Sequence, residues 1–146
     1  MEYQQLLNVK RSDLYQFLLQ SALEDIIKYK PGTTIRDLHS GFNYEKDLSG
    51  KKKKANTIVN IKSMKKDEKY VVTFETLSGI TTTSYLLQDK DGKTQVTFKE
   101  EFKSRNGKSS AGLFESLFKK RSIKKLQKNF NQIEEYLNNK ENPKAE

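Results

Sequence analysis

Cysteine is absent from the 146 residues of the sequence. Its absence excludes disulfide bonds, thiolate nucleophiles, cysteine-based zinc sites and iron–sulfur clusters. Long apolar runs are also absent. No stretch approaches the roughly 18 residues that a membrane-spanning helix needs, and the first residues lack the charged and apolar regions of a secretion signal. We therefore expect a cytoplasmic protein.

Apolar residues are scarce as well. They make up 34% of the chain, charged residues make up 32%, and the mean hydropathy is -0.88. A chain of this length can form one core, but that core must be thin and efficiently patterned. We expect a single domain over residues 1–138 and a disordered polar tail over residues 139–146.

Positive charge is concentrated in the middle and later parts of the chain. The net charge is +9, and residues 51–128 contain 20 basic and 8 acidic residues. The basic clusters are Lys51, Lys52, Lys53, Lys54, Lys119, Lys120, Arg121, Lys124, Lys125 and Lys128. They could contact an anionic membrane or nucleic acid, but a solvated surface would explain them equally well. No aromatic residues interleave with them, so we expect at most nonspecific binding of nucleic acid.

The hydrophobic pattern predicts strands and helices in a simple order. A weak strand over residues 2–9 precedes a helix over residues 13–29, with Ser12 as its N-cap, and a second short helix is expected near residues 35–38. From residue 41 the period changes to two. Five strands are expected, over residues 42–44, 57–64, 70–77, 80–88 and 94–102. Their short connections require antiparallel neighbours, and a long helix should follow to residue 138.

The last predicted helix has two apolar stripes on different sides. One stripe should pack on a sheet, and it contains Leu126, Phe130, Ile133 and Leu137. The other contains Leu113, Phe114, Leu117 and Phe118. A break between residues 119 and 122 would turn both stripes inward, and we favour it; cover by loops or a partner subunit, or contact with a membrane, are the alternatives. Lys119 lies within the first stripe and could meet Glu100.

The order β-α-α-β(5)-α resembles the helix-grip (SRPBCC) superfamily, which includes START lipid-transfer domains and birch-pollen-allergen-like proteins. More narrowly, GFNYEKDL at residues 41–48 and GLFESLFKKRSIKKLQKNF at residues 112–130 look like an uncharacterised family of small lysine-rich proteins from Gram-positive bacteria. The resemblance implies an α+β domain in which a curved antiparallel sheet of about six strands wraps around the C-terminal helix. It also implies a cavity for lipids or other apolar molecules in many members.

Alternation along the strands indicates which residues would line such a cavity. The candidates are Asn60, Tyr70, Val72, Phe74, Thr82, Ser84, Val96, Phe98, Glu100, Phe102, Leu126, Phe130 and Ile133. An empty void of about 300 Å³ would cost about 7 kcal/mol, so the cavity should be small, ligand-filled or hydrated. We expect a noncatalytic binder or carrier of a small apolar or amphipathic ligand. The alternative is an interaction protein that uses the basic clusters.

Catalytic and metal chemistry have little support in the sequence. His39 is the only histidine, which leaves no cluster of metal ligands. RNGKSS at residues 105–110 imitates a phosphate-binding loop, but Phe102 stands where that motif requires glycine. Glu100 on an apolar face could act as an acid or base, although a lysine partner would explain it as well. We expect no cofactor, no metal and no catalytic residue, with an enzyme using Glu100 as a further possibility.

Overall fold

The computed structural model of the chain describes residues 1–46, 56–105 and 113–141; at residues 113–121 and at Glu141 it describes the backbone alone. The elements follow the expected order, with a short 3₁₀ helix in place of the second α-helix. The helices are α1 (Arg11–Tyr29), η1 (Ile35–Asp37) and α2 (Leu113–Glu141). The strands are β1 (Glu2–Leu7), β2 (Asn43–Lys46), β3 (Thr57–Lys65), β4 (Lys69–Glu75), β5 (Gly79–Lys90) and β6 (Lys93–Ser104).

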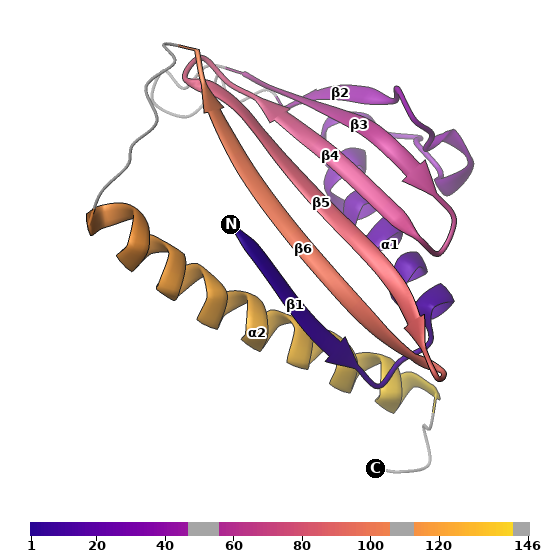
Figure 1. Ribbon diagram of the computed structural model, residues 1–146. Coiled ribbons are helices and arrows are strands. Elements are labelled where there is room, and N and C mark those ends of the chain that lie inside the picture. The colour runs from indigo at the N-terminus through magenta and orange to yellow at the C-terminus, as the bar shows by residue number, and fades with distance from the viewer. Residues whose placement is uncertain (47–55, 106–112, 142–146) are drawn as a thin grey trace.

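The strands form one antiparallel sheet in the order β1-β6-β5-β4-β3-β2. Strands β2 to β6 are neighbours in the order in which they follow along the chain. The N-terminal strand β1 pairs with the last strand, β6, and forms the other edge of the sheet (Figure 1). The tightest connection is the predicted hairpin between β5 and β6, where Asp91 and Gly92 have φ angles of 55° and 85°. Two positive φ angles are typical of a hairpin turn that matches the twist of its strands.

The core lies on one face of this sheet, which we call the inner face. Helix α1 lies behind the sheet in Figure 1, and α2 runs along β1. Buried residues of both helices join those of the inner face in a single apolar cluster. The strand residues of that cluster that are most enclosed include Leu7, Val59, Ile61, Tyr70, Val72, Leu87, Val96 and Phe98. The antiparallel sheet with its long C-terminal helix confirms the expected fold class.

Three local predictions about the helices differ from the structure. Helix α1 begins at Arg11 with Lys10 as its N-cap, so Ser12 lies inside the first turn and makes no cap. Helix α2 is continuous from Leu113 to Glu141, so the expected break between residues 119 and 122 does not occur. The same helix extends to Glu141, beyond the expected end at Asn138.

Candidate functional site

Most of the predicted cavity residues lie on the inner face. In β4 and β6 alternate side chains point to the same side of the sheet. Tyr70, Val72, Val96 and Phe98 are between 0% and 6% exposed there. Phe74 and Glu100 are half-buried, and Phe102 is 57% exposed.

Three predicted cavity residues lie on the opposite, outer face. Asn60 alternates with the buried Val59 and Ile61, so it points away from the helices. Thr82 and Ser84 alternate in the same way with the inner-face residues of β5. Their placement in the cavity was therefore wrong.

The physical reason for the error at Asn60 is a bulge in β3. The register between β3 and β4 shifts between Ile61 and Ser63, which returns Met64 to the inner face. A bulge adds one residue to a strand and so reverses the alternation beyond it. Strict alternation counted back from Met64, which lies on the inner face, therefore assigns Asn60 to the inner face as well, and this is wrong.

The predicted core stripe of α2 packs as expected. Phe130 is 2% exposed, and its ring stacks on Tyr3 of β1 with centroids 6.3 Å apart and an interplanar angle of 12°. Leu137 is 7% exposed, and Leu126 and Ile133 pack against the core while remaining partly exposed. The interface between β1 and this half of α2 is therefore filled by side chains rather than hollow.

Several predicted surface residues lie outside the described residues. The side chains of the first apolar stripe, Leu113, Phe114, Leu117 and Phe118, belong to this group. So do Lys51, Lys52, Lys53, Lys54, Lys119, Lys120 and Arg121, and with them the expected contact between Lys119 and Glu100. Lys124, Lys125 and Lys128 are described and are exposed on α2, which is also what a solvated helix face would show.

A group of tyrosines forms a polar centre within the apolar inner face. We call Tyr15 of α1, Tyr44 of β2, Tyr70 of β4 and Tyr85 of β5 the tyrosine cluster. The rings of Tyr70 and Tyr85 are 6.3 Å apart. Burial, with a smaller contribution from Tyr85, raises the pKa of Tyr70 to about 12. Burial also raises the pKa of the other three, so all four hydroxyls are protonated at neutral pH and can donate hydrogen bonds.

One member of the cluster has a strong partner. The Tyr44 hydroxyl donates to Asp25 Oδ2 of α1 at 2.6 Å, and Lys46 Nζ of β2 lies 2.8 Å from the same oxygen. Burial alone would raise the pKa of Asp25, but the hydrogen bonds from Lys46 and Tyr44 outweigh it and lower that pKa below its ordinary value. This network fastens α1 to the β2 edge of the sheet.

The other members have no such partner. Within the described part of the chain, no hydrogen bond reaches the hydroxyls of Tyr15, Tyr70 and Tyr85. Tyr15 and Tyr70 are each 6% exposed, and Thr83 on the same face is 7% exposed and also lacks a partner there. Their hydroxyl oxygens are not fully enclosed, because Asn60 Oδ1 is the only fully buried side-chain polar atom without a hydrogen-bond partner among the described residues. Water or a ligand can therefore bond to these hydroxyls.

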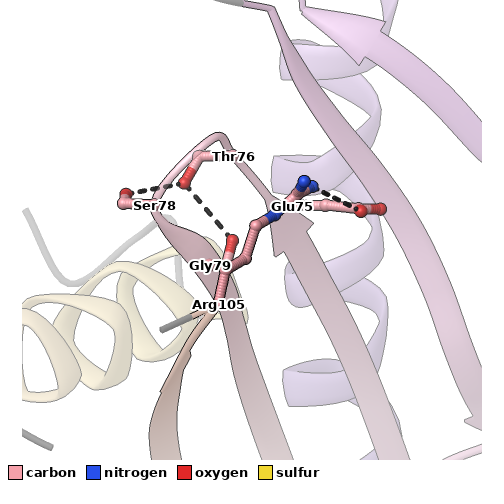
Figure 2. Close-up of polar contacts among 5 residues, drawn as sticks. All are labelled: Glu75, Thr76, Ser78, Gly79 and Arg105. Carbon is pink, nitrogen blue, oxygen red and sulfur yellow. Dashed lines mark hydrogen bonds and ion pairs between the residues drawn. The ribbon is translucent and has the colours of Figure 1, made fainter. Parts of the chain in front are cut away.

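The turn between β4 and β5 forms the rim of the inner face (Figure 2). Thr76 Oγ1 forms hydrogen bonds with Ser78 Oγ at 3.0 Å and with the carbonyl oxygen of Gly79 at 3.3 Å. Arg105, just after β6, pairs with Glu75 of β4 across a distance of 3.0 Å. These contacts tie the ends of β4, β5 and β6 together.

Phe102 is positioned by this rim. A Cβ atom at Gly79 would overlap the carbonyl oxygen of Lys103 and would lie 2.9 Å from the ring of Phe102. Only glycine therefore lets the aromatic ring lie against the backbone of β5. The ring remains 57% exposed, which leaves an apolar surface at this end of the inner face.

A separate groove lies between the two long helices. It has a volume of about 580 Å³, and Phe17 of α1 and Tyr136 of α2 meet beside it with ring centroids 5.7 Å apart. Its lining is mostly polar, and it comprises Asp13, Gln16, Phe17, Gln20, Ser21, Glu24, Tyr136, Leu137 and Lys140. The sequence could not indicate this groove because it depends on how α1 meets the end of α2. Its polar lining makes it a poorer apolar site than the inner face.

None of the helices within the described ranges combines the length and the apolarity needed to cross a membrane.

Comparison with known proteins supports the architecture. A search of curated protein sequences finds no match. The crystal structure of Ara h 8.0201 is similar, with a TM-score of 0.59 and 15% identity over 94% of this chain and 95% of that one. The solution structure of the Aha1 dimer from Colwellia psychrerythraea has a TM-score of 0.60 and 10% identity over 94% of each chain. Protein Ms6760 from Mycobacterium smegmatis has a TM-score of 0.57 and 14% identity over 94% of this chain and 89% of its own.

These identities are low, so the similarities show the fold alone. The fold is the helix grip that the order of elements predicted. The sequence itself places the chain in a family, because residues 1–118 match the profile described as "Domain of unknown function (DUF3284)". The chain belongs to the DUF3284 family.

Proposed function

We propose that the chain binds, and releases or carries, a small amphipathic molecule on the inner face. The polar part of this ligand would bond to the tyrosine cluster, and its apolar part would lie against Phe98 and Phe102. The observation that carries the proposal is the set of inner-face hydroxyls that have no hydrogen bond within the described chain and are open enough to receive one, above all that of Tyr70. A ligand with one polar group would satisfy them and would bury aromatic surface at the same time.

The rest of the inner face is consistent with binding rather than catalysis. Asp25, Tyr44 and Lys46 bond to one another, so this network fastens elements together. The interface between β1 and α2 is filled by side chains, so a ligand would have to bind on the other part of the inner face. There Glu100 is half-buried and Phe102 is exposed. The site we propose is therefore displaced from the C-terminal half of α2 toward strands β4, β5 and β6.

Native mass spectrometry tests the proposal directly. The protein would be purified without detergent, and its mass would be compared before and after extraction with organic solvent. We expect an extractable small molecule or, in extracted protein, saturable binding of the neutral apolar dye Nile red. Binding should weaken at least tenfold in Phe102→Asp, because a charge replaces the apolar surface at the rim.

Ile80→Asp is the matched control. Ile80 lies on the neighbouring strand β5, is 39% exposed and points to the outer face. Both substitutions introduce the same charge at the same end of the sheet, but only one lies on the inner face. No adduct together with equal Nile red binding by the wild type and both variants would rule out a ligand site on this face.

A further inference from the structure

The inner face carries a carboxylate for which the proposed function does not yet account. Glu100 lies on β6 directly opposite Thr83 of β5, and it alternates with Phe98 and Phe102 on its own strand. It is half-buried, and within the described residues its side chain forms no hydrogen bond or ion pair. A half-buried carboxylate is stabilised by a cationic or hydrogen-donating partner.

The charged groups nearest in sequence do not supply this partner. Lys99 and Lys103 alternate with Glu100 on β6 and point to the outer face. The amino group of Met1 donates to the backbone carbonyl oxygen of Glu100 at 2.8 Å and forms no ion pair with its carboxylate in the described structure. The carboxylate therefore remains available on the inner face.

Aromatic side chains and a threonine share the inner face with Glu100. The ring of Tyr85 meets that of Phe98 edge to face with centroids 5.3 Å apart, and the exposed ring of Phe102 lies beyond Glu100 on the same strand. Thr83 is 7% exposed, and its hydroxyl has no partner in the described part of the chain. Aromatic faces attract cations, and a carboxylate forms strong hydrogen bonds with an ammonium group.

We propose that the ligand is an apolar primary amine, whose ammonium group bonds to the Glu100 carboxylate and the Thr83 hydroxyl while its hydrocarbon part covers Phe98 and Phe102. This inference rests on the proposed function and specifies its ligand class. It places the polar group at Glu100 and Thr83, beside Tyr85 at the edge of the tyrosine cluster. A fatty acid would place a second negative charge beside Glu100, so anionic amphiphiles are disfavoured. The net charge of +9 opposes binding of a cation only weakly, because physiological salt screens charges that lie more than about 8 Å from the ligand.

The test uses three probes with the same ten-carbon chain: decylamine, decanol and decanoate. Each would displace Nile red from the extracted full-length protein at pH 7.4 in 150 mM salt, below its micelle concentration. We expect decylamine to bind at least about tenfold more tightly than decanol, since a charge-assisted bond replaces a neutral one. Decanoate should bind most weakly.

The variants separate the role of Glu100 from general effects of charge. Glu100→Gln keeps the shape and removes the charge, so it should abolish the preference for decylamine and leave decanol binding unchanged. Glu101→Gln is the matched control, because Glu101 is the next residue, is exposed and points to the outer face. Thr83→Val is a second, nearly isosteric variant that should lower decylamine affinity about fivefold.

The outcomes distinguish the two proposals. Equal affinity for decylamine and decanol in the wild type, or the same loss in Glu100→Gln and Glu101→Gln, would overturn the amine assignment and leave the proposed function standing. Failure of every probe, including Nile red, would overturn both. Preference for decylamine that disappears in Glu100→Gln alone would establish the ligand class.

Discussion

Two tyrosines of the inner face are expected to respond to the same substitution to different extents. Tyr44→Phe removes a hydroxyl that donates to Asp25 at 2.6 Å. Tyr70→Phe removes a hydroxyl that has no hydrogen bond within the described chain and whose oxygen is not fully enclosed. Both changes keep the aromatic ring, so packing changes little and the difference reports on the hydroxyl groups.

The magnitudes follow from the partners. A hydrogen bond to a charged group contributes about 1.5–3 kcal/mol, so Tyr44→Phe should lower the free energy of unfolding by about 2 kcal/mol. An unpaired hydroxyl in an apolar site costs about 1–3 kcal/mol, part of which water relieves. The Tyr70 hydroxyl is not fully enclosed, so water can bond to it and Tyr70→Phe should change the free energy of unfolding of ligand-free protein by less than about 1 kcal/mol.

Urea denaturation at pH 7, followed by circular dichroism, measures both changes. The protein must first be freed of ligand by extraction, because a bound ligand would stabilise the wild type by mass action. The slope of the free energy of unfolding against urea concentration should be the same in both variants. The unfolding midpoint should fall in Tyr44→Phe and change little in Tyr70→Phe. If Tyr70→Phe loses as much stability as Tyr44→Phe, the Tyr70 hydroxyl has a partner in the free protein and the case for the site fails.

Three further predictions concern the core, the rim and high pH. Phe130→Ala should lower the free energy of unfolding by about 3–5 kcal/mol in urea denaturation, because the ring is 2% exposed and stacks on Tyr3; a loss below about 1 kcal/mol would mean that α2 does not close the core. Gly79→Ala should lower the melting temperature by several degrees, since its Cβ would overlap the carbonyl oxygen of Lys103, and an unchanged value would contradict the tight rim. Alkaline pH should destabilise the fold, because the pKa of Tyr70 rises on folding from 10.0 to about 12. Because the pKa is higher in the folded state, the folded protein keeps its full stability below pH 10. About 3 kcal/mol of the free energy of unfolding should be lost between pH 10 and 12, and Tyr70→Phe should reduce this loss.

Much of the fold could be predicted because its signals are local. The hairpin at Asp91 and Gly92, the two-residue period of the strands and the stripe through Phe130 and Leu137 each depend on neighbours within a few residues. The pairing of β1 with β6 could not be read in this way, since it joins residues about 90 positions apart. The resemblance to the helix-grip fold predicted a sheet of about six strands but did not specify this pairing.

The site was harder to predict than the fold for physical reasons. The sequence gives no sign of the bulge in β3, yet the bulge reverses the alternation of side chains along the strand. The prediction therefore assigned Asn60 to the wrong face. In β5, a run of β-branched threonines hides the alternation, so only the apolar residues that follow it, such as Leu87, identify the inner face. The bond between Tyr44 and Asp25 joins a strand to a helix 19 residues away, and no periodicity predicts such a contact.

The tyrosine cluster places polar hydroxyl groups within a thin apolar core, and the proposed ligand gives a reason for them. Only 34% of the residues are apolar, so the core is already small. Phenylalanine would pack equally well at Tyr70 and Tyr85 if packing were the only requirement. Tyr44 differs, because its hydroxyl fastens α1 to β2 and so has a structural role. The hydroxyls of Tyr70 and Tyr85 bond to nothing in the described part of the free protein, so they are better explained by a ligand that binds reversibly and stabilises the protein each time it binds.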